Sequence, residues 1–227
     1  MEKRKIIIGT YDTALEGLWT LTAWNFSKAI AKESYAEVPG HNGHIDLSTA
    51  LTDGEPYYGN REFEAVFESS EGTRLAREER INQMINKLDG WRFNITLPDD
   101  PDHYISGRVR VERLYNDLAH ASVRVSATCD PWRYNNSETV VGLIASSTTQ
   151  TTSLINNGRR AVVPSVTVSG GTVLVSFGIG DGVQSWSLNS REYKPKDLPD
   201  LYLKSGATPL AYSGTGQITL TYREAVL

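Results

Sequence analysis

The sequence predicts a mainly β protein, with a strand-rich, barrel-like first domain that includes one amphipathic helix and a β-sandwich as its second domain. Apolar and polar residues alternate with a period of two in most segments, and one segment has the period of a helix. The composition also changes along the chain: residues 1–133 contain 37 Asp, Glu, Lys and Arg and 17 Ser and Thr, whereas residues 134–227 contain 13 and 23. We therefore expect domains at residues 1–134 and 135–227, with the junction at residues 135–137.

The strands of the first domain are predicted from alternation. In residues 61–68, Phe63, Ala65 and Phe67 fall on one face and mostly acidic residues on the other. Weaker versions of this pattern occur at residues 18–24, 92–97, 103–113 and 121–129, and residues 98–102 are expected to turn the chain. Such half-buried strands are typical of an antiparallel sheet or barrel.

Residues 73–88 are predicted to form the helix. Thr73 or Ser70 can cap its first turn, and Gly90 lies where a left-handed residue would end it. The expected apolar face consists of Leu75, Ile81, Met84, Ile85 and Leu88, with Arg77, Glu78, Glu79 and Arg80 opposite. We interpret the apolar face as core that packs on the sheet.

The second domain is expected to be built from short strands between Gly-rich turns. Low charge, many β-branched residues and turn signals at short intervals favour a sandwich. Residues 146–153 are predicted to be a polar loop. The expected strands are residues 161–168, 172–177, 183–188, 201–203, 209–212 and 217–222.

Charge and hydropathy exclude several classes of protein. A formal net charge of −4 argues against nucleic-acid binding, which usually needs a basic surface. No segment approaches the ~18 apolar residues of a membrane helix. The apolar stretch at residues 6–8 is shorter than the ~7 residues of a signal-peptide core, so we do not expect export by that route. The single cysteine, Cys129, cannot form an internal disulfide.

Two polar clusters are candidate sites. His41 and His44 could be a metal pair, but they flank glycines in an expected turn and lack further ligands. Asp99, Asp100, Asp102 and His103 could bind calcium or act as an acid–base pair. We interpret this second group as solvated acids in a turn.

Other candidates also favour structural roles. Cys129 ends an apolar strand face and is expected to be a buried thiol. Residues 178–182 (GIGDG) precede no helix and are expected to be a flexible turn, not a dinucleotide loop. Trp186, Tyr202 and Tyr212 could form a sugar platform, although packing is the preferred interpretation. No catalytic, cofactor or metal residue is predicted, and the partner-binding residues remain unassigned.

Several motifs resemble one family, the distal tail proteins (Dit) of long, flexible-tailed bacteriophages. Residues 88–90 (LDG), followed by 99–109 (DDPDHYISGRV), are similar to its most recognisable stretch. The other motifs are 38–46 (VPGHNGHID), 58–67 (YGNREFEAVF) and 129–134 (CDPWRY), with weaker matches at 156–158, 163–164 and 222–224. They occur in the family's order, and the resemblance covers nearly the whole chain.

The resemblance implies a structural virion protein at the phage tail tip. It implies that the first domain forms a ring of six copies, which connects the tail tube to the baseplate hub and to receptor-binding proteins, and that the second domain is galectin-like. Edge strands could pair between subunits. The resemblance implies no catalysis, cofactor, nucleic-acid binding or membrane binding, and synthesis in the bacterial host cytoplasm.

Two alternatives remain open. One is a carbohydrate-binding module that acts in host-surface recognition, an idea that rests on fold analogy. The other is a glycan hydrolase that uses Asp99 or Asp102.

Overall fold

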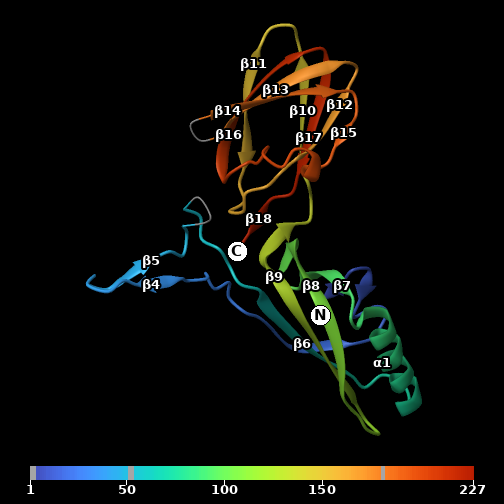
Figure 1. Cartoon of the computed structure of the whole chain (residues 1–227). Coiled ribbons are helices and arrows are strands. Elements are labelled where there is room, and N and C mark those ends of the chain that lie inside the picture. Colours follow the sequence, from blue (N-terminus) through green and yellow to red (C-terminus); the bar gives the residue numbers. More distant parts are fainter. Residues whose placement is uncertain (1–3, 51–53, 180–181) are drawn as a thin grey trace. The chain divides into compact units, whose positions relative to one another are not determined.

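The computed structural model describes residues 4–50, 54–179 and 182–227, and the chain divides into two compact units, Met1–Arg133 and Tyr134–Leu227 (Figure 1). Each unit has its own hydrophobic core. The part of the chain that is described contains no helix with both the length and the apolar character needed to cross a bilayer.

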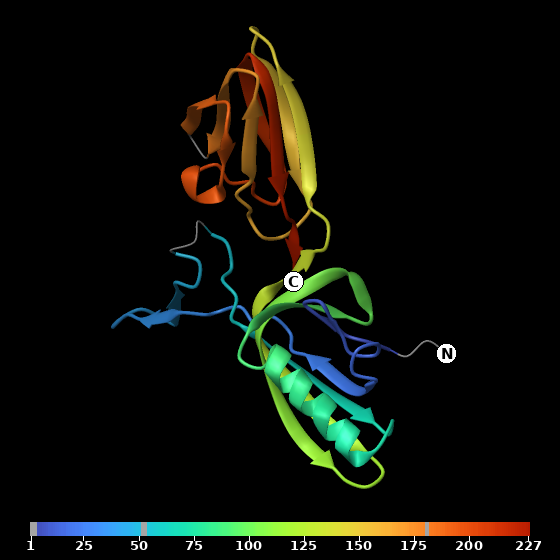
Figure 2. The same ribbon diagram turned by 90° about the vertical axis from the view of Figure 1, so that its right-hand side faces the viewer.

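The first unit is a curled half-barrel with a single α-helix. Its main sheet has the strand order β2-β1-β7-β8-β9-β6-β3. The helix α1 (Arg74–Leu88) lies along β8, as Figure 2 shows. The strands are β1 (Ile7–Ile8), β2 (Tyr11–Asp12), β3 (Thr20–Phe26), β6 (Arg61–Ser69), β7 (Arg92–Leu97), β8 (Asp100–Asn116) and β9 (Ala121–Asn135). The predicted mainly β fold with one helix is confirmed.

Alternation buries one face of the sheet against α1. In β6, Phe63, Ala65 and Phe67 are buried, as predicted from their spacing. Their antiparallel partners on β9 are Ala127, Val125 and Val123, which are buried as well. These matched rows form the centre of the first core.

The observed strands differ from the expected ones mainly at their ends. β7 has the predicted bounds, but β3 begins and ends two residues later than expected. β8 already begins at Asp100, so the expected turn at residues 98–102 is shorter than predicted. The β7–β8 register shift between Ile95 and Leu97 accompanies this tight turn.

The helix has the predicted ends but not the predicted apolar face. Thr73 caps it by accepting a hydrogen bond from the Ala76 N–H, and Gly90 follows with a φ of 79°. However, Leu75 is 79% exposed and Arg77 only 1% exposed, so the assignment of these two side chains was wrong. The buried stripe is Arg77, Ile81, Met84 and Leu88. At 3.6 residues per turn, Leu75 lies roughly 160° around the helix from Arg77.

The buried Arg77 joins α1 to the turn between β8 and β9. Its Nη1 donates to the carbonyl oxygen of Gly72 at 2.6 Å. Its Nη2 donates to the carbonyl oxygens of Asp117 and Leu118, both at 3.0 Å. A guanidinium can satisfy several acceptors in fixed directions, which explains why arginine occupies this core position.

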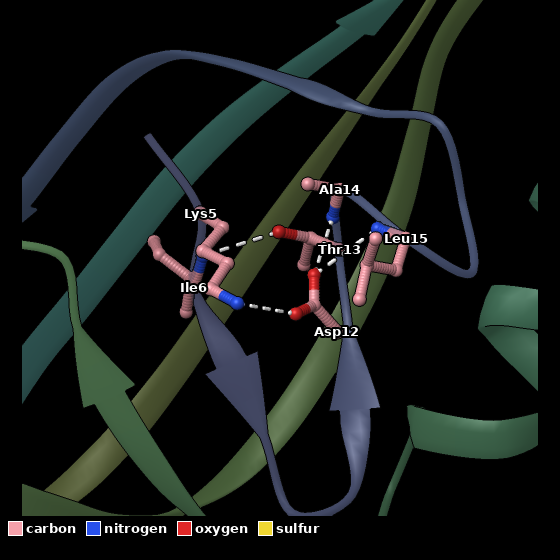
Figure 3. A network of polar contacts seen from close by, with 6 residues as sticks. All are labelled: Lys5, Ile6, Asp12, Thr13, Ala14 and Leu15. Atoms are coloured by element: carbon pink, nitrogen blue, oxygen red, sulfur yellow. Dashed lines mark hydrogen bonds and ion pairs between the residues drawn. The ribbon is translucent and has the colours of Figure 1, made fainter. Parts of the chain in front are cut away.

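A polar network fixes the hairpin at the start of the sheet (Figure 3). The Asp12 carboxylate accepts hydrogen bonds from Lys5 Nζ at 2.9 Å and from the N–H groups of Ala14 and Leu15 at 2.9 and 3.1 Å. The Ile6 N–H donates to Thr13 Oγ1 at 3.1 Å. Burial acts to raise the pKa of Asp12, but these hydrogen bonds outweigh it, so the pKa lies below its ordinary value. The carboxylate therefore remains charged and keeps the hairpin closed at neutral pH.

The second unit contains two four-stranded sheets around one core. The first has the order β10-β17-β12-β15 and the second the order β11-β16-β13-β14. The first sheet consists of β10 (Thr139–Ala145), β17 (Gly216–Tyr222), β12 (Ser165–Ser169) and β15 (Glu192–Tyr193); the second consists of β11 (Gln150–Asn156), β16 (Gly206–Gly214), β13 (Thr172–Ile179) and β14 (Gly182–Asn189). A short 3-10 helix η1 (Pro195–Asp197) and β18 (Ala225–Val226) complete this unit.

Two sequence-based assignments in the second unit were wrong. The expected polar loop at residues 146–153 overlaps β11, in which Leu154 and Asn156 are buried. Hydroxyl residues occupy much of this strand, and β-branched threonine fits a half-buried strand well. The expected strand at residues 201–203 is instead irregular, and only an isolated bridge pairs Leu203 with Val162.

We predict that Arg77→Ala lowers the free energy of unfolding by about 2–4 kcal/mol, because three carbonyl groups lose the donor that joins them to the helix and a cavity remains where the buried side chain was. Urea denaturation of the full chain measures this loss. Arg110→Ala is the matched control, because Arg110 is exposed on β8 and has no ion-pair partner among the described residues. The control should change stability by less than about 0.5 kcal/mol. Equal stability of the two variants would contradict the assigned role of Arg77.

Candidate functional site

The most unusual feature of the first unit is a long arm between β3 and β6, which we define as residues 28–60 (Figure 1). Its two legs pair through the Ala31–Tyr58 bridge. Beyond them, β4 (Tyr35–Glu37) and β5 (His44–Asp46) form a separate two-stranded sheet. None of the described residues of the arm is buried. The arm therefore has no core of its own.

The arm displays large apolar side chains to solvent. Ile30 is 74% exposed, and Tyr35 and Tyr57 are each 56% exposed. Val38, Ile45 and Leu47 are exposed as well. Exposed apolar patches on a soluble protein usually mark an interaction surface.

The base of the arm is rigidly fixed, in contrast to its exposed remainder. Arg61, only 8% exposed, donates from Nε to the Ser27 carbonyl oxygen at 2.6 Å and from Nη1 to the Pro131 carbonyl oxygen at 3.3 Å. Its guanidinium carbon lies 3.6 Å from the centroid of the Phe26 ring. The Glu62 N–H also donates to Ser27 Oγ at 2.8 Å. The arm thus leaves the sheet in a defined direction.

Three of the sequence motifs of the first unit meet around this base. The ring of Tyr58, from the YGNREF stretch, contacts the ring of Trp132, from CDPWRY, edge to face at 5.5 Å. Gly107, from the DDPDHYISGRV stretch, packs directly on Cys129, because a Cβ on Gly107 would lie 2.5 Å from the Cys129 Sγ. The motifs therefore specify close packing at the root of the arm.

The strand that precedes the arm is also unpartnered along one side. β3 is the last strand of the sheet order and, within the part of the chain that the structure describes, pairs only with β6. None of its seven residues is charged. A register shift between Leu21 and Ala23 bends it. Uncharged edge strands can pair with another chain unless something covers them.

His41 and His44, which were considered as a metal pair and not preferred as one, lie at the tip of the arm. His44 Nδ1 is 3.7 Å from Glu37 Oε1, and His41 Nδ1 is 3.4 Å from the Gly43 carbonyl oxygen. These residues line an open hollow of about 490 Å³ together with Val38 and Pro39. Across the described ranges, no three His, Cys, Asp or Glu side chains are grouped so that they could hold a metal ion.

The acidic cluster does not consist only of solvated residues, so that expectation was wrong for one member. The Asp100 side chain is 21% exposed. It forms an ion pair with Arg133, whose Nη1 lies 2.9 Å from Asp100 Oδ2. It also lies 2.6 Å from His103 Nδ1. Asp99 is more exposed and reaches Arg4 only at 3.9 Å, and Asp102 is exposed. Asp100 therefore differs from Asp99 and Asp102, which are exposed, because its ion pair with Arg133 holds the end of β9.

The three aromatic residues considered as a sugar platform do not share an exposed face. Tyr212 belongs to the buried core of the second unit. Trp186 packs against that core, with its ring 6.1 Å from the ring of Phe177. Tyr202 is half-buried beside Lys204. Trp186 and Tyr212 therefore pack against other side chains, which confirms the preferred interpretation for these two residues.

The Gly-rich segment at residues 178–182, expected to be a flexible turn, is partly strand: Gly178 and Ile179 end β13, and Gly182 begins β14, so the expectation was wrong for these three residues. Gly180 and Asp181, which form its centre, lie outside the described residues. The two strands pair up to the Ile179–Gly182 position.

Sequence reasoning did not find the arm's apolar residues. Residues 28–60 lack a sustained period of two or of 3.6, and the arm contains Pro39, Pro56 and several glycines. The only signal was the VPGHNGHID stretch, which marked the arm's tip without showing that the tip stands away from a core.

The sequence matches no protein-family model and no curated protein. Among solved structures, the chain is similar to the crystal structure of SPP1 Dit (gp 19.1), described as a paradigm of the hub adsorption apparatus in phages that infect Gram-positive bacteria. The TM-score is 0.69 and the sequence identity 16%, and the match covers 96% of this chain and 98% of that chain. The chain therefore has a Dit-like fold over nearly its whole length.

We predict that the Cys129 thiol does not react with a thiol reagent at pH 8 in the folded protein. Burial raises its pKa from 9.0 to about 12, and the charges of Glu62 and Asp130 add to this effect. In urea the thiol should react completely. Because the unfolded thiol ionises first as the pH rises, the free energy of unfolding should fall between about pH 9 and pH 12. Cys129→Ala should lack this part of the pH dependence, and fast labelling of the folded protein would contradict the assignment.

Proposed function

We propose that this chain is a structural protein of the tail tip of a bacteriophage with a long, flexible tail. In this proposal six copies form a closed ring that connects the tail tube to the baseplate hub and offers docking sites to receptor-binding proteins. The observation that carries the proposal is the arm, which exposes apolar residues on a segment without a core. The Dit-like fold supports the part of the proposal that places the chain in a phage tail.

The arm requires a surface that its own unit does not supply. An isolated two-stranded hairpin is marginally stable in water. The arm's base is nevertheless fixed by Arg61, so its tip is held out from the sheet and is ready to lie on a neighbour. A neighbour of the same kind offers the same arm to the next copy. Such a head-to-tail contact produces a ring when the rotation closes.

The free edge of β3 gives a second contact within the proposed ring. Pairing between copies would satisfy its unpaired backbone groups and remove an aggregation hazard. The absence of charge on β3 favours this use, because no like charges need to be brought together. Sheet extension and arm exchange would then act at the same subunit boundary, since β3 leads directly into the arm.

In this proposal the chain has a structural role. It carries out no catalytic step, needs no cofactor, and contacts neither nucleic acid nor a membrane. The protein would be made in the cytoplasm of the bacterial host and act in the virion, at the tail tip. The second unit would be the galectin-like part and would serve the receptor-binding proteins. The carbohydrate-binding alternative gains no support from Tyr212, which lies in the core, or from Trp186, which packs against it.

We predict that Ile30→Asp prevents ring formation while the chain stays folded. The purified full chain should have the mass of six subunits, or a whole multiple of six, in size-exclusion chromatography with light scattering. A carboxylate at Ile30 would be costly to bury against a neighbour, so this variant should elute as a single chain. Leu174→Asp is the control, because Leu174 is an exposed leucine of the second unit. Rings that persist in Ile30→Asp, or a wild-type chain that never assembles, would refute the proposal.

A further inference from the structure

The chain contains the dipeptide Asn-Gly twice, as Asn42–Gly43 and as Asn157–Gly158. An asparagine before glycine is chemically vulnerable, because the glycine has no side chain to shield its backbone nitrogen and adopts most backbone conformations. That nitrogen can attack the asparagine side chain. The two pairs have the same sequence but opposite surroundings, and the structure therefore distinguishes them.

The first pair lies open at the tip of the arm, in the turn between β4 and β5. Asn42 and Gly43 are both exposed, and Gly43 lines the open hollow of the tip. Among the described residues, neither the Asn42 side chain nor the Gly43 N–H forms a hydrogen bond. Gly43 has a φ of 83°, and a Cβ there would meet no atom within 4 Å. The Asn42 side chain is therefore free to turn toward the Gly43 nitrogen.

The second pair is held in place directly after β11. Asn157 donates from its N–H and from Nδ2 to Glu224 Oε1, at 3.1 and 3.2 Å. The Gly158 N–H donates to the Oδ1 of the buried Asn156 at 3.0 Å. Gly158 is itself buried, and a Cβ there would lie 2.7 Å from the backbone of Ala225. These contacts hold both the amide and the nitrogen that would attack it.

We propose that Asn42 is a self-modification site, at which the folded chain converts its own amide to a carboxylate with water as the only co-reactant. The Gly43 nitrogen loses its proton and bonds to Asn42 Cγ, while the bond from Cγ to Nδ2 breaks and ammonia leaves. Water then opens the cyclic imide. Opening at Cγ gives aspartate, and opening at the backbone carbonyl carbon gives isoaspartate, whose main chain is longer by one methylene. Nothing is oxidised or reduced.

The conversion changes the arm's tip in charge and in shape. It adds a negative charge to a tip that already carries the exposed Glu37, and isoaspartate lengthens the turn between β4 and β5. A consequence for assembly rests on the proposed ring. Because a carboxylate is costly to bury against a neighbour, chains that are modified before they assemble should enter rings less readily.

Peptide mapping of the full chain, incubated in mildly alkaline buffer, tests the modification. Chromatography separates the peptides that contain asparagine, aspartate and isoaspartate. In the folded chain, Asn42 should convert at least about tenfold faster than Asn157, because Asn157 and Gly158 must first break three hydrogen bonds. In urea the ratio of the two rates should be clearly smaller. A smaller ratio in the folded chain, or the same ratio in urea, would overturn the inference.

Asn42→Asp and Asn42→Gln test the consequence for assembly separately. Asn42→Asp should need a protein concentration at least about tenfold higher than the wild type to form rings, whereas the uncharged Asn42→Gln should assemble like the wild type. Rings of Asn42→Asp at the wild-type concentration would refute the consequence and leave the modification intact. A wild type that never assembles refutes the proposed ring, while the peptide map still decides whether Asn42 is modified.

Discussion

Residues 28–60 do not bury their apolar side chains within their own unit, and the proposed assembly depends on this constraint. Every described residue of this arm is at least partly exposed, although Ile30, Tyr35 and Tyr57 are side chains that water disfavours. The sheet from which the arm departs already has a complete core between its strands and α1. A second molecule is therefore the natural source of the missing contacts.

Two segments of the first unit that expose apolar side chains are each hydrogen-bonded to a buried arginine. Arg61 fixes the base of the arm through carbonyl groups at Ser27 and Pro131. Arg77 fixes the turn below Leu118 in the same way. Burying a guanidinium is costly unless it is hydrogen-bonded. Carbonyl oxygens of the two surface segments accept hydrogen bonds from Arg61 and Arg77, although Arg77 Nε has no partner among the described residues. Rigid presentation of apolar residues is typical of a protein that works through its surfaces.

The regular parts of the fold could be predicted because their signal is local. The alternation in residues 61–68 and the cap at Thr73 were sufficient to place β6 and α1. Arg77 and Leu75 exchanged their expected places because the turn at Asp117, distant in sequence, supplies acceptors for the guanidinium. The arm was missed for a different reason, since residues 28–60 have no regular period and none of the described residues among them is buried. The polar cluster at Asp100 depended on Arg133, which no local pattern could identify.

Hydrogen–deuterium exchange over residues 28–48, measured in dilute and in concentrated samples of the full chain, tests the central claim most directly. If the arm lies on another copy, its backbone amides should exchange rapidly in the dilute sample and become protected in the concentrated one. The core amides of β6 should stay protected in both samples. Rapid exchange of the arm at every concentration, in a chain whose β6 is protected, would contradict the account.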